Sequence, residues 1–216
     1  MKNVLITGAT GMVGAIVLRN CLESPEIEKV TSISRKPLGI SHPKLEEVVH
    51  SDFLDYSTVE HHFQNQDAAY FCIGVYTGQV PDSTFKTITV DYTKTFADVL
   101  VKNSPTATFC FLSGAGADPK EKSKMSFARY KGMAENYLLK LGFEHVFIFR
   151  PGYIYPVEKR KEPNVSYRIF RSLYPMLKGL MANSSITSEE LGKAMFQAGL
   201  SGAGKTILEN KDIKEI

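Results

Sequence analysis

Three glycines near the start of the sequence have the spacing of a turn that binds phosphate groups. Residues 7–14 read TGATGMVG, so Gly8, Gly11 and Gly14 separate an apolar run from a helical pattern. Glycine there lets the chain turn sharply and lets its backbone approach a pyrophosphate without an intervening Cβ. The following helix would offer free N–H groups to the phosphates. The predicted dinucleotide contacts are Gly8, Thr10, Gly11, Met12, Val13 and Gly14. The alternative is an ordinary tight turn.

The end of the next strand-like run indicates which dinucleotide is preferred. A site for NAD usually has an acidic residue there, which binds the ribose 2′-hydroxyl. Here the run VTSIS ends in Ser34 and is followed by Arg35 and Lys36, whose cations match a 2′-phosphate. We therefore predict NADP(H) as the cofactor, and a solvent-exposed basic turn is the alternative. Asp52 and Phe53, after the third run, are a less specific prediction for the adenine.

Two other patterns suggest chemistry that their context does not support. Residues 199–206, GLSGAGKT, match the phosphate-loop pattern letter for letter. That loop follows a strand and precedes a helix, whereas this segment follows a helical pattern and precedes a strand-like run. We interpret it as a glycine-ended helix, a turn and the start of a strand. His61 and His62 are adjacent and would point about 100° apart on a helix, so no metal site is predicted.

Strand-like and helical patterns alternate along the chain and would position these residues. Apolar runs lie near 3–7, 29–34, 45–49, 67–73, 107–112, 145–150 and 205–209. Helical periodicity covers 12–23, 84–102, 125–141 and a segment ending near Gly199, which Thr187 and Glu190 open with the spacing of a capping box. Runs such as AAYFCIG are apolar at successive positions, as in strands covered on both faces. The sequence therefore predicts an α/β fold with a doubly wound parallel sheet.

The length of the chain predicts one domain over residues 1–216. Too few residues follow Pro151 for a separate substrate domain, so loops must supply substrate specificity. We predict a small C-terminal substrate lid over residues 153–185, although its charges also fit a plain solvated surface.

Composition argues against several classes of partner. The net charge is only +3, which favours neither a nucleic-acid footprint nor a polybasic membrane anchor. No run approaches the roughly 18 apolar residues of a membrane span, and the sequence begins with a strand-like run. Cys21, Cys72 and Cys110 lie in apolar runs, which indicates buried reduced thiols. We therefore predict a cytoplasmic protein without nucleic-acid or membrane partners.

Taken together, these segments resemble the atypical short-chain dehydrogenase/reductase family, in the NAD(P)-binding Rossmann branch that includes Tat-interacting-protein-like proteins. The resemblance covers nearly the whole chain. Its carriers are TGATGMVG, SISRK, SDF at 51–53, FCIG at 71–74, VDYT at 90–93, FLSGAGAD at 111–118, KGMAE at 131–135, FRPGYI at 149–154 and ITSEELGKAM at 186–195.

The resemblance implies roles for residues that follow the later strands. Cys72, Ile73 and Gly74 would line the cofactor, and Pro151 and Gly152 would lie beside the nicotinamide amide. Ser113 would bind the reacting carbonyl. Lys131 matches the family's lysine, which holds the ribose.

The sequence departs from the family at the proton donor. In the family a tyrosine four residues before this lysine acts as general acid/base, and the lysine lowers its pKa. That position is Phe127, which has no exchangeable proton. Tyr130 is the nearest substitute on the helix, with packing as its alternative role.

Two functional classes follow. One is an NADPH-dependent reductase of a small carbonyl compound that uses Ser113, Lys131 and a substitute acid such as Tyr130. The other is a non-catalytic NADP(H)-binding regulatory or interaction protein, with no small-molecule substrate. Either would be a monomer or a homodimer.

Overall fold

The seven predicted strands are present and form one parallel sheet in the order β3-β2-β1-β4-β5-β6-β9. The computed structural model describes residues 1–158 and 184–216. The strands are β1 (Lys2–Thr7), β2 (Ile27–Ser34), β3 (Leu45–Val49), β4 (Ala68–Phe71), β5 (Thr108–Leu112), β6 (Val146–Arg150) and β9 (Ile207–Glu209). Every residue of β4 is buried, which explains why the sequence shows a continuous apolar run rather than alternation.

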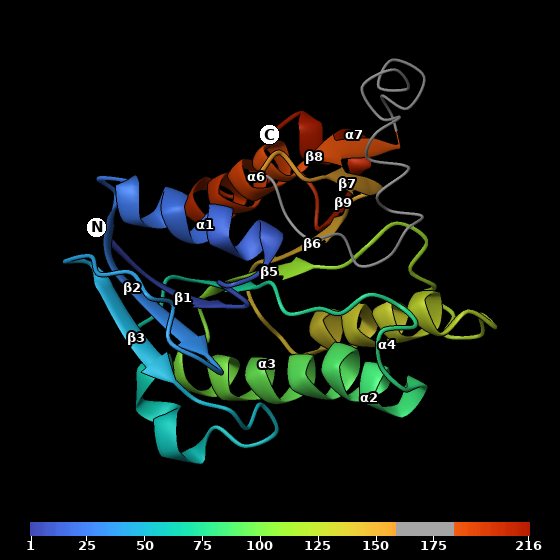
Figure 1. Cartoon of the computed structure of the whole chain (residues 1–216), viewed down its shortest axis with the longest axis horizontal. Coiled ribbons are helices and arrows are strands. Elements are labelled where there is room, and N and C mark those ends of the chain that lie inside the picture. The colour runs from blue at the N-terminus through green and yellow to red at the C-terminus, as the bar shows by residue number, and fades with distance from the viewer. Residues whose placement is uncertain (159–183) are drawn as a thin grey trace.

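Helices cover both faces of the sheet and confirm the doubly wound α/β fold (Figure 1). α1 (Met12–Glu23) and α6 (Ser188–Ser201) pack on one face, and α3 (Tyr92–Asn103) and α4 (Ser126–Lys140) pack on the other. The predicted capping box is confirmed, because the Glu190 N–H donates to Thr187 Oγ1 at 3.1 Å and the Glu190 carboxylate accepts the Thr187 N–H at 2.8 Å.

The strand order reverses beside β1, which lies between β2 and β4. The chain first builds outward from β1 to β2 and β3, and then crosses back to β4 on the other side. Open parallel sheets bind ligands at the carboxyl ends of their strands, in the crevice at such a reversal. The segments after β1, β2, β4, β5 and β6 all begin at this edge, and they contain the predicted site residues.

Several short elements were not predicted. The segment predicted as a helix over 84–102 consists of α2 (Asp82–Lys86), a π-helical turn η2 (Thr87–Asp91) and α3 without a break. The others are the 3₁₀ helix η1 (Ser57–Phe63), α7 (Asn210–Lys214) and a separate pair of parallel strands, β7 (Tyr153–Tyr155) and β8 (Ser185–Thr187). β7 and β8 have three residues each, fewer than an alternating pattern needs, and no apolar run like the one at 205–209 marks them. Of the predicted lid over 153–185, residues 159–183 lie outside the described residues.

The three thiols are buried and unpaired with one another. Burial raises the pKa of the Cys72 thiol to about 12, so the group is protonated at neutral pH. Protonated thiols in a packed interior are unreactive. The cysteines therefore serve as small apolar residues of the core layer beneath α1 and α6.

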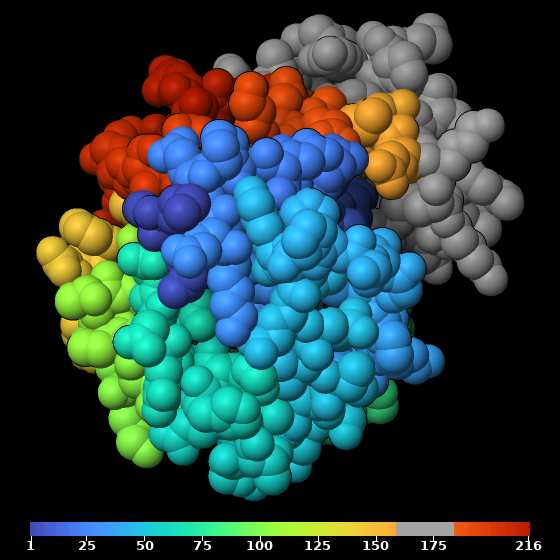
Figure 2. Space-filling view, turned by 90° about the vertical axis from the view of Figure 1, so that its left-hand side faces the viewer, coloured from blue at the N-terminus to red at the C-terminus, as the bar shows by residue number. Residues whose placement is uncertain are grey.

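The segment that matches the phosphate-loop pattern has the predicted inverted context. α6 ends at Ser201, Gly202 adopts a positive φ of 84°, and β9 follows. The segment lines a groove of about 560 Å³ at the end of the sheet where the strands begin. Figure 2 shows this end of the molecule, where the N-terminal residues (dark blue) lie beside α6 (orange-red). The Lys205 ammonium pairs with Asp212 at 2.5 Å.

We expect Lys205→Ala to leave dinucleotide affinity unchanged, because this lysine lies at the opposite end of the sheet from the first glycine turn. Gly11→Val, in that first turn, is the matched comparison and should abolish binding. Fluorescence titration of both variants measures the difference. Magnesium-dependent ATP binding by the wild type that disappears in Lys205→Ala would show a genuine phosphate loop.

Candidate functional site

The first glycine turn packs its backbone directly against the end of β4. Gly8 has a positive φ of 80°, and a Cβ there would lie 2.5 Å from the carbonyl carbon of Cys72. A Cβ at Gly14 would lie only 2.2 Å from the carbonyl oxygen of Gly8. No side chain fits either gap. The turn therefore needs glycine both for its conformation and for the close approach of β1, α1 and β4.

The first turn of α1 has backbone N–H groups that do not take part in this contact. Gly11 is the N-cap residue and provides no side-chain cap, and the intrahelical hydrogen bonds begin with the Ala15 N–H, 3.0 Å from the Gly11 carbonyl oxygen. The Gly11 N–H donates to the Gly8 carbonyl oxygen at 2.9 Å, so the N–H groups of Met12, Val13 and Gly14 are the ones left available to an anion. Thr10 and Gly11 are exposed, while Met12 is half-buried and Val13 is buried. This cradle of glycine backbone and helix donors fits a pyrophosphate.

The end of β2 presents two cations beside this cradle. β1 and β2 are neighbours, and the Thr7 hydroxyl donates to the Ile33 carbonyl oxygen at 3.0 Å. The Ser34 hydroxyl is turned back, because it donates to the Lys36 carbonyl oxygen at 2.7 Å. Arg35 and Lys36 are exposed. Within the described ranges, no carboxylate forms an ion pair with either cation.

The two residues predicted near the adenine differ in exposure. Asp52 is exposed, and its carboxylate accepts the Leu54 N–H at 2.9 Å. Phe53 is only 3% exposed, and its ring packs 5.4 Å from that of Tyr92 in the core layer beneath α3. Asp52 is therefore accessible to a ligand, whereas Phe53 is engaged in the core.

The ends of β4 and β6 complete this edge of the sheet. Cys72 is held by its N–H, which donates to the Thr7 carbonyl oxygen at 3.0 Å, and the half-buried Ile73 and exposed Gly74 follow it. Pro151 accepts the Ala115 N–H at 2.9 Å, and Gly152 donates to Asn210 Oδ1 at 3.0 Å.

Asn210, at the start of α7, is a site residue that sequence reasoning missed. Its amide group also donates to the Ser185 carbonyl oxygen at 3.0 Å, so it joins the start of β8 to the loop after β6. No sequence pattern marks this contact, because Asn210 lies 58 residues from Gly152.

α4 places Phe127, Lys131 and Glu135 on one face, because the residues are four apart. The residue that faces the Phe127 ring is Gly114, the second residue after β5. A Cβ on Gly114 would lie 2.6 Å from Phe127 Cζ, so the ring occupies the space that a side chain at 114 would need.

Lys131 is buried beneath this face. Only 7% of the residue is exposed, and its ammonium donates to the Leu112 carbonyl oxygen at 2.9 Å and lies 5.0 Å from the centre of the Phe111 ring. Burial lowers the pKa of Lys131 to about 8, against an opposing effect of Glu135. The ammonium of Lys131 therefore loses its proton at a lower pH than that of a solvent-exposed lysine.

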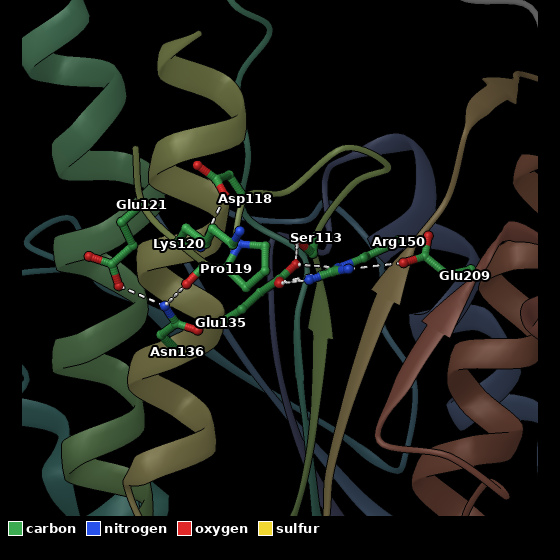
Figure 3. A network of polar contacts seen from close by, with 9 residues as sticks. All are labelled: Ser113, Asp118, Pro119, Lys120, Glu121, Glu135, Asn136, Arg150 and Glu209. Atoms are coloured by element: carbon green, nitrogen blue, oxygen red, sulfur yellow. Dashed lines mark hydrogen bonds and ion pairs between the residues drawn. The ribbon is translucent and has the colours of Figure 1, made fainter. Parts of the chain in front are cut away.

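The Ser113 hydroxyl points into a buried polar network with Glu135 and Arg150 (Figure 3). It donates to the carboxylate of Glu135, which also accepts hydrogen bonds from Arg150 Nε at 3.1 and 3.2 Å. Arg150 extends from the end of β6 and pairs with Glu209 at 2.9 Å. Sequence reasoning used Glu135 and Arg150 only as letters of the family pattern. The available signal was Arg150, a charged residue at the end of the apolar strand VFIFR.

Tyr130 points toward α2 rather than toward Lys131. Its hydroxyl donates to Asp82 Oδ2 at 2.6 Å, and its ring packs 5.9 Å from that of Phe85. Hydrogen bonds from the Ser126 and Tyr130 side chains lower the pKa of the Asp82 carboxyl. Tyr130 therefore holds α2 against α4.

Comparison with known proteins agrees with this arrangement. A family model described as NAD(P)H-binding matches residues 8–197. Protein HTATIP2 of Rattus norvegicus is 27% identical over 177 residues, which are 80% of this chain and 72% of that protein. Protein FMP52, mitochondrial, of Saccharomyces cerevisiae is 26% identical over 229 residues, covering 99% of this chain and 96% of that protein. The Bordetella bronchiseptica enzyme WbmH in complex with NAD+ superposes with a TM-score of 0.71 at 19% identity, over 97% of this chain and 75% of that one.

The prediction of a cytoplasmic protein is wrong on this comparison, since the yeast relative is named mitochondrial. The prediction relied on reduced thiols, and burial keeps thiols reduced in any compartment that the folded chain enters. Among the residues that the structure describes, no helix has the length and apolarity to span a bilayer.

We expect Gly114→Ala to lower the free energy of unfolding by about 1–3 kcal/mol, because the new methyl group overlaps the Phe127 ring. Phe127→Leu should recover most of this loss when combined with it, giving a favourable coupling in a double-mutant cycle. Urea denaturation measures all four proteins. Gly204→Ala, at a position with open space, is the control. Strictly additive effects would contradict the contact.

Proposed function

The chain belongs to the NAD(P)H-binding family of atypical short-chain dehydrogenases/reductases, and from this membership we propose that it binds NADP(H) and reduces a small carbonyl compound at an impaired site. The impairment is the loss of the family's proton-donating tyrosine. When bound, the cofactor supplies a hydride, and the chain must orient the acceptor and provide the proton.

The preference for NADP(H) is supported by the two cations at the end of β2. Arg35 and Lys36 are exposed beside the cradle and have no acidic neighbour of the kind that binds a ribose 2′-hydroxyl. A guanidinium binds phosphate through two parallel hydrogen bonds. The proposed cofactor contacts are Gly8, Thr10, Gly11, Met12, Val13, Gly14, Ser34, Arg35, Lys36, Asp52, the backbone of Phe53, Cys72, Ile73, Gly74, Lys131, Pro151 and Gly152.

The proposal of an impaired site depends on one observation, the contact between Phe127 and Gly114. Neither residue has a polar side chain, so the place where the family donates a proton is apolar. A general acid contributes roughly 10²–10⁴ in rate. We therefore expect ketone reduction by the wild type to be slow, with Lys131 holding the ribose and water supplying the proton.

A second candidate function is a non-catalytic one, in which bound NADP(H) serves a regulatory or interaction protein. Its support is that both nearby hydroxyls are engaged: Ser113 donates to Glu135, and Tyr130 donates to Asp82. A hydroxyl held by a carboxylate elsewhere is not free to bind a substrate carbonyl. Turnover with any acceptor separates the two candidates.

We expect NADPH to bind at least about tenfold tighter than NADH, a difference of about 1.4 kcal/mol. Arg35→Ala should remove most of this difference, because it deletes the proposed 2′-phosphate contact. Calorimetry with both cofactors measures it. Lys124→Ala, at another exposed cation, is the control for net charge. Equal wild-type affinities for the two cofactors would refute the preference.

We expect Phe127→Tyr to raise the rate of NADPH-dependent ketone reduction about tenfold or more. The new hydroxyl would sit on Cζ, the ring atom closest to Gly114, and the Lys131 cation would lower its pKa. Loss of NADPH absorbance measures the rate, and Phe127→Leu is the control without a hydroxyl. Robust wild-type turnover that survives in Phe127→Leu but collapses in Tyr130→Phe would show a relocated acid instead.

A further inference from the structure

One buried carboxylate lies at the centre of the polar network at the ends of β5 and β6. Glu135 is only 1% exposed, yet it carries a charged partner at each side: Arg150 from β6 and Lys131 one turn earlier on α4. Burying a lone carboxylate is very costly, so the hydrogen bonds from Arg150 and Ser113 are needed to offset that cost. Glu135 has this cost at the edge of the proposed site, which indicates a functional role for its carboxylate.

The two hydrogen-bond partners of Glu135, Ser113 and Arg150, each lie next to a segment of the proposed site. Ser113 immediately precedes Gly114, which faces Phe127. Arg150 immediately precedes Pro151 and Gly152, and the Ala115 N–H is tied to the Pro151 carbonyl oxygen at 2.9 Å. Figure 3 shows how the Glu135 side chain, coming from α4, reaches Ser113 and Arg150 at the ends of two neighbouring strands.

Resting on the proposed function, we propose that Glu135 is a positioning residue of the cofactor site. Its carboxylate fixes the loops after β5 and β6 through Ser113 and Arg150, and its negative charge keeps the Lys131 ammonium protonated so that it can hold the nicotinamide ribose.

The electrostatic part follows from what surrounds Lys131. The groups acting on it are the Leu112 carbonyl oxygen and the Phe111 ring from β5, the Cys72 thiol after β4, and Glu135 on its own helix. Because burial raises the pKa of Cys72 to about 12, this thiol is neutral and supplies no charge. Within the described part of the chain, Glu135 is thus the anion that opposes the effect of burial on Lys131.

The sign of the effect can be tested. Burial has already lowered the pKa of Lys131 to about 8, and Glu135 raises it. Replacing the carboxylate with a neutral amide removes the raising contribution, so the pKa of Lys131 falls further and the side chain is neutral at physiological pH. Cofactor affinity that depends on this cation should then be lost at a lower pH than in the wild type.

The experiment is a titration of NADH affinity from pH 6 to pH 9.5 in wild type, Glu135→Gln and Lys131→Met. NADH is used because it lacks the 2′-phosphate, which itself titrates near pH 6. We expect wild-type affinity to fall as the pH rises through about 8, the same fall at least about one pH unit lower in Glu135→Gln, and no such step in Lys131→Met.

Glu209→Gln is the matched control, because it breaks the exposed end of the same network and leaves Glu135 charged. If the network has only a structural role, both variants should be less stable and the pH midpoint of NADH affinity should not change. The proposal predicts a shifted midpoint for Glu135→Gln alone. Thermal unfolding of each variant without cofactor separates loss of stability from loss of affinity.

A direct measurement on the wild type keeps the proposal testable if Glu135→Gln does not fold. The Lys131 Cε chemical shift, assigned with Lys131→Arg, reports the protonation of the amine. A wild-type midpoint near 8 is expected, and a midpoint below 7 would overturn the proposal. The proposal would also be overturned if the wild type binds NADH and NADPH but the pH midpoint of NADH affinity is the same in the wild type and in Glu135→Gln. That outcome would leave the proposed function intact. No binding of either cofactor by the wild type would overturn the proposed function instead.

Discussion

The contact of backbone with backbone between the first glycine turn and the end of β4 is the constraint on which the rest of the site depends. Gly8 lies against Cys72, and Gly14 lies against Gly8, at distances that leave no room for a Cβ. This contact brings α1 down onto the sheet at the point where the strand order reverses. The free N–H groups of α1, the cations after β2 and the segment after β4 consequently share one edge.

α4 applies a second constraint, because its spacing of four residues places three different side chains against the same edge of the sheet. Lys131 and Glu135 lie on the same face as Phe127, so all three meet the ends of β5 and β6. The face carries an apolar ring at one end, a buried cation in the middle and a buried carboxylate at the other. This face is thus charged where it meets Leu112 and Ser113 and apolar where it meets Gly114.

The fold was predictable to a greater extent than the site. Strand-like runs rich in apolar residues located all seven strands of the main sheet, and Thr187 with Glu190 located the start of α6, because these signals are local. The direction of the Ser113 hydroxyl was not predictable, since its partner Glu135 lies 22 residues away on another element. Tyr130 and Asp82 are 48 residues apart, and Gly152 and Asn210 are 58 apart. Side-chain partners over such separations depend on packing that the sequence does not display.

The contacts made by Glu209 and Asn210 have a consequence for the order in which the site forms during synthesis. The glycine turn and its β4 contact lie within the first third of the chain and are therefore translated early. Arg150 and Gly152, in contrast, acquire their last partners only when residues 209 and 210 have been translated. The partners of the glycine turn are therefore present in a nascent chain long before those of Arg150 and Gly152, so the two sides of this edge of the sheet are completed at different points of synthesis.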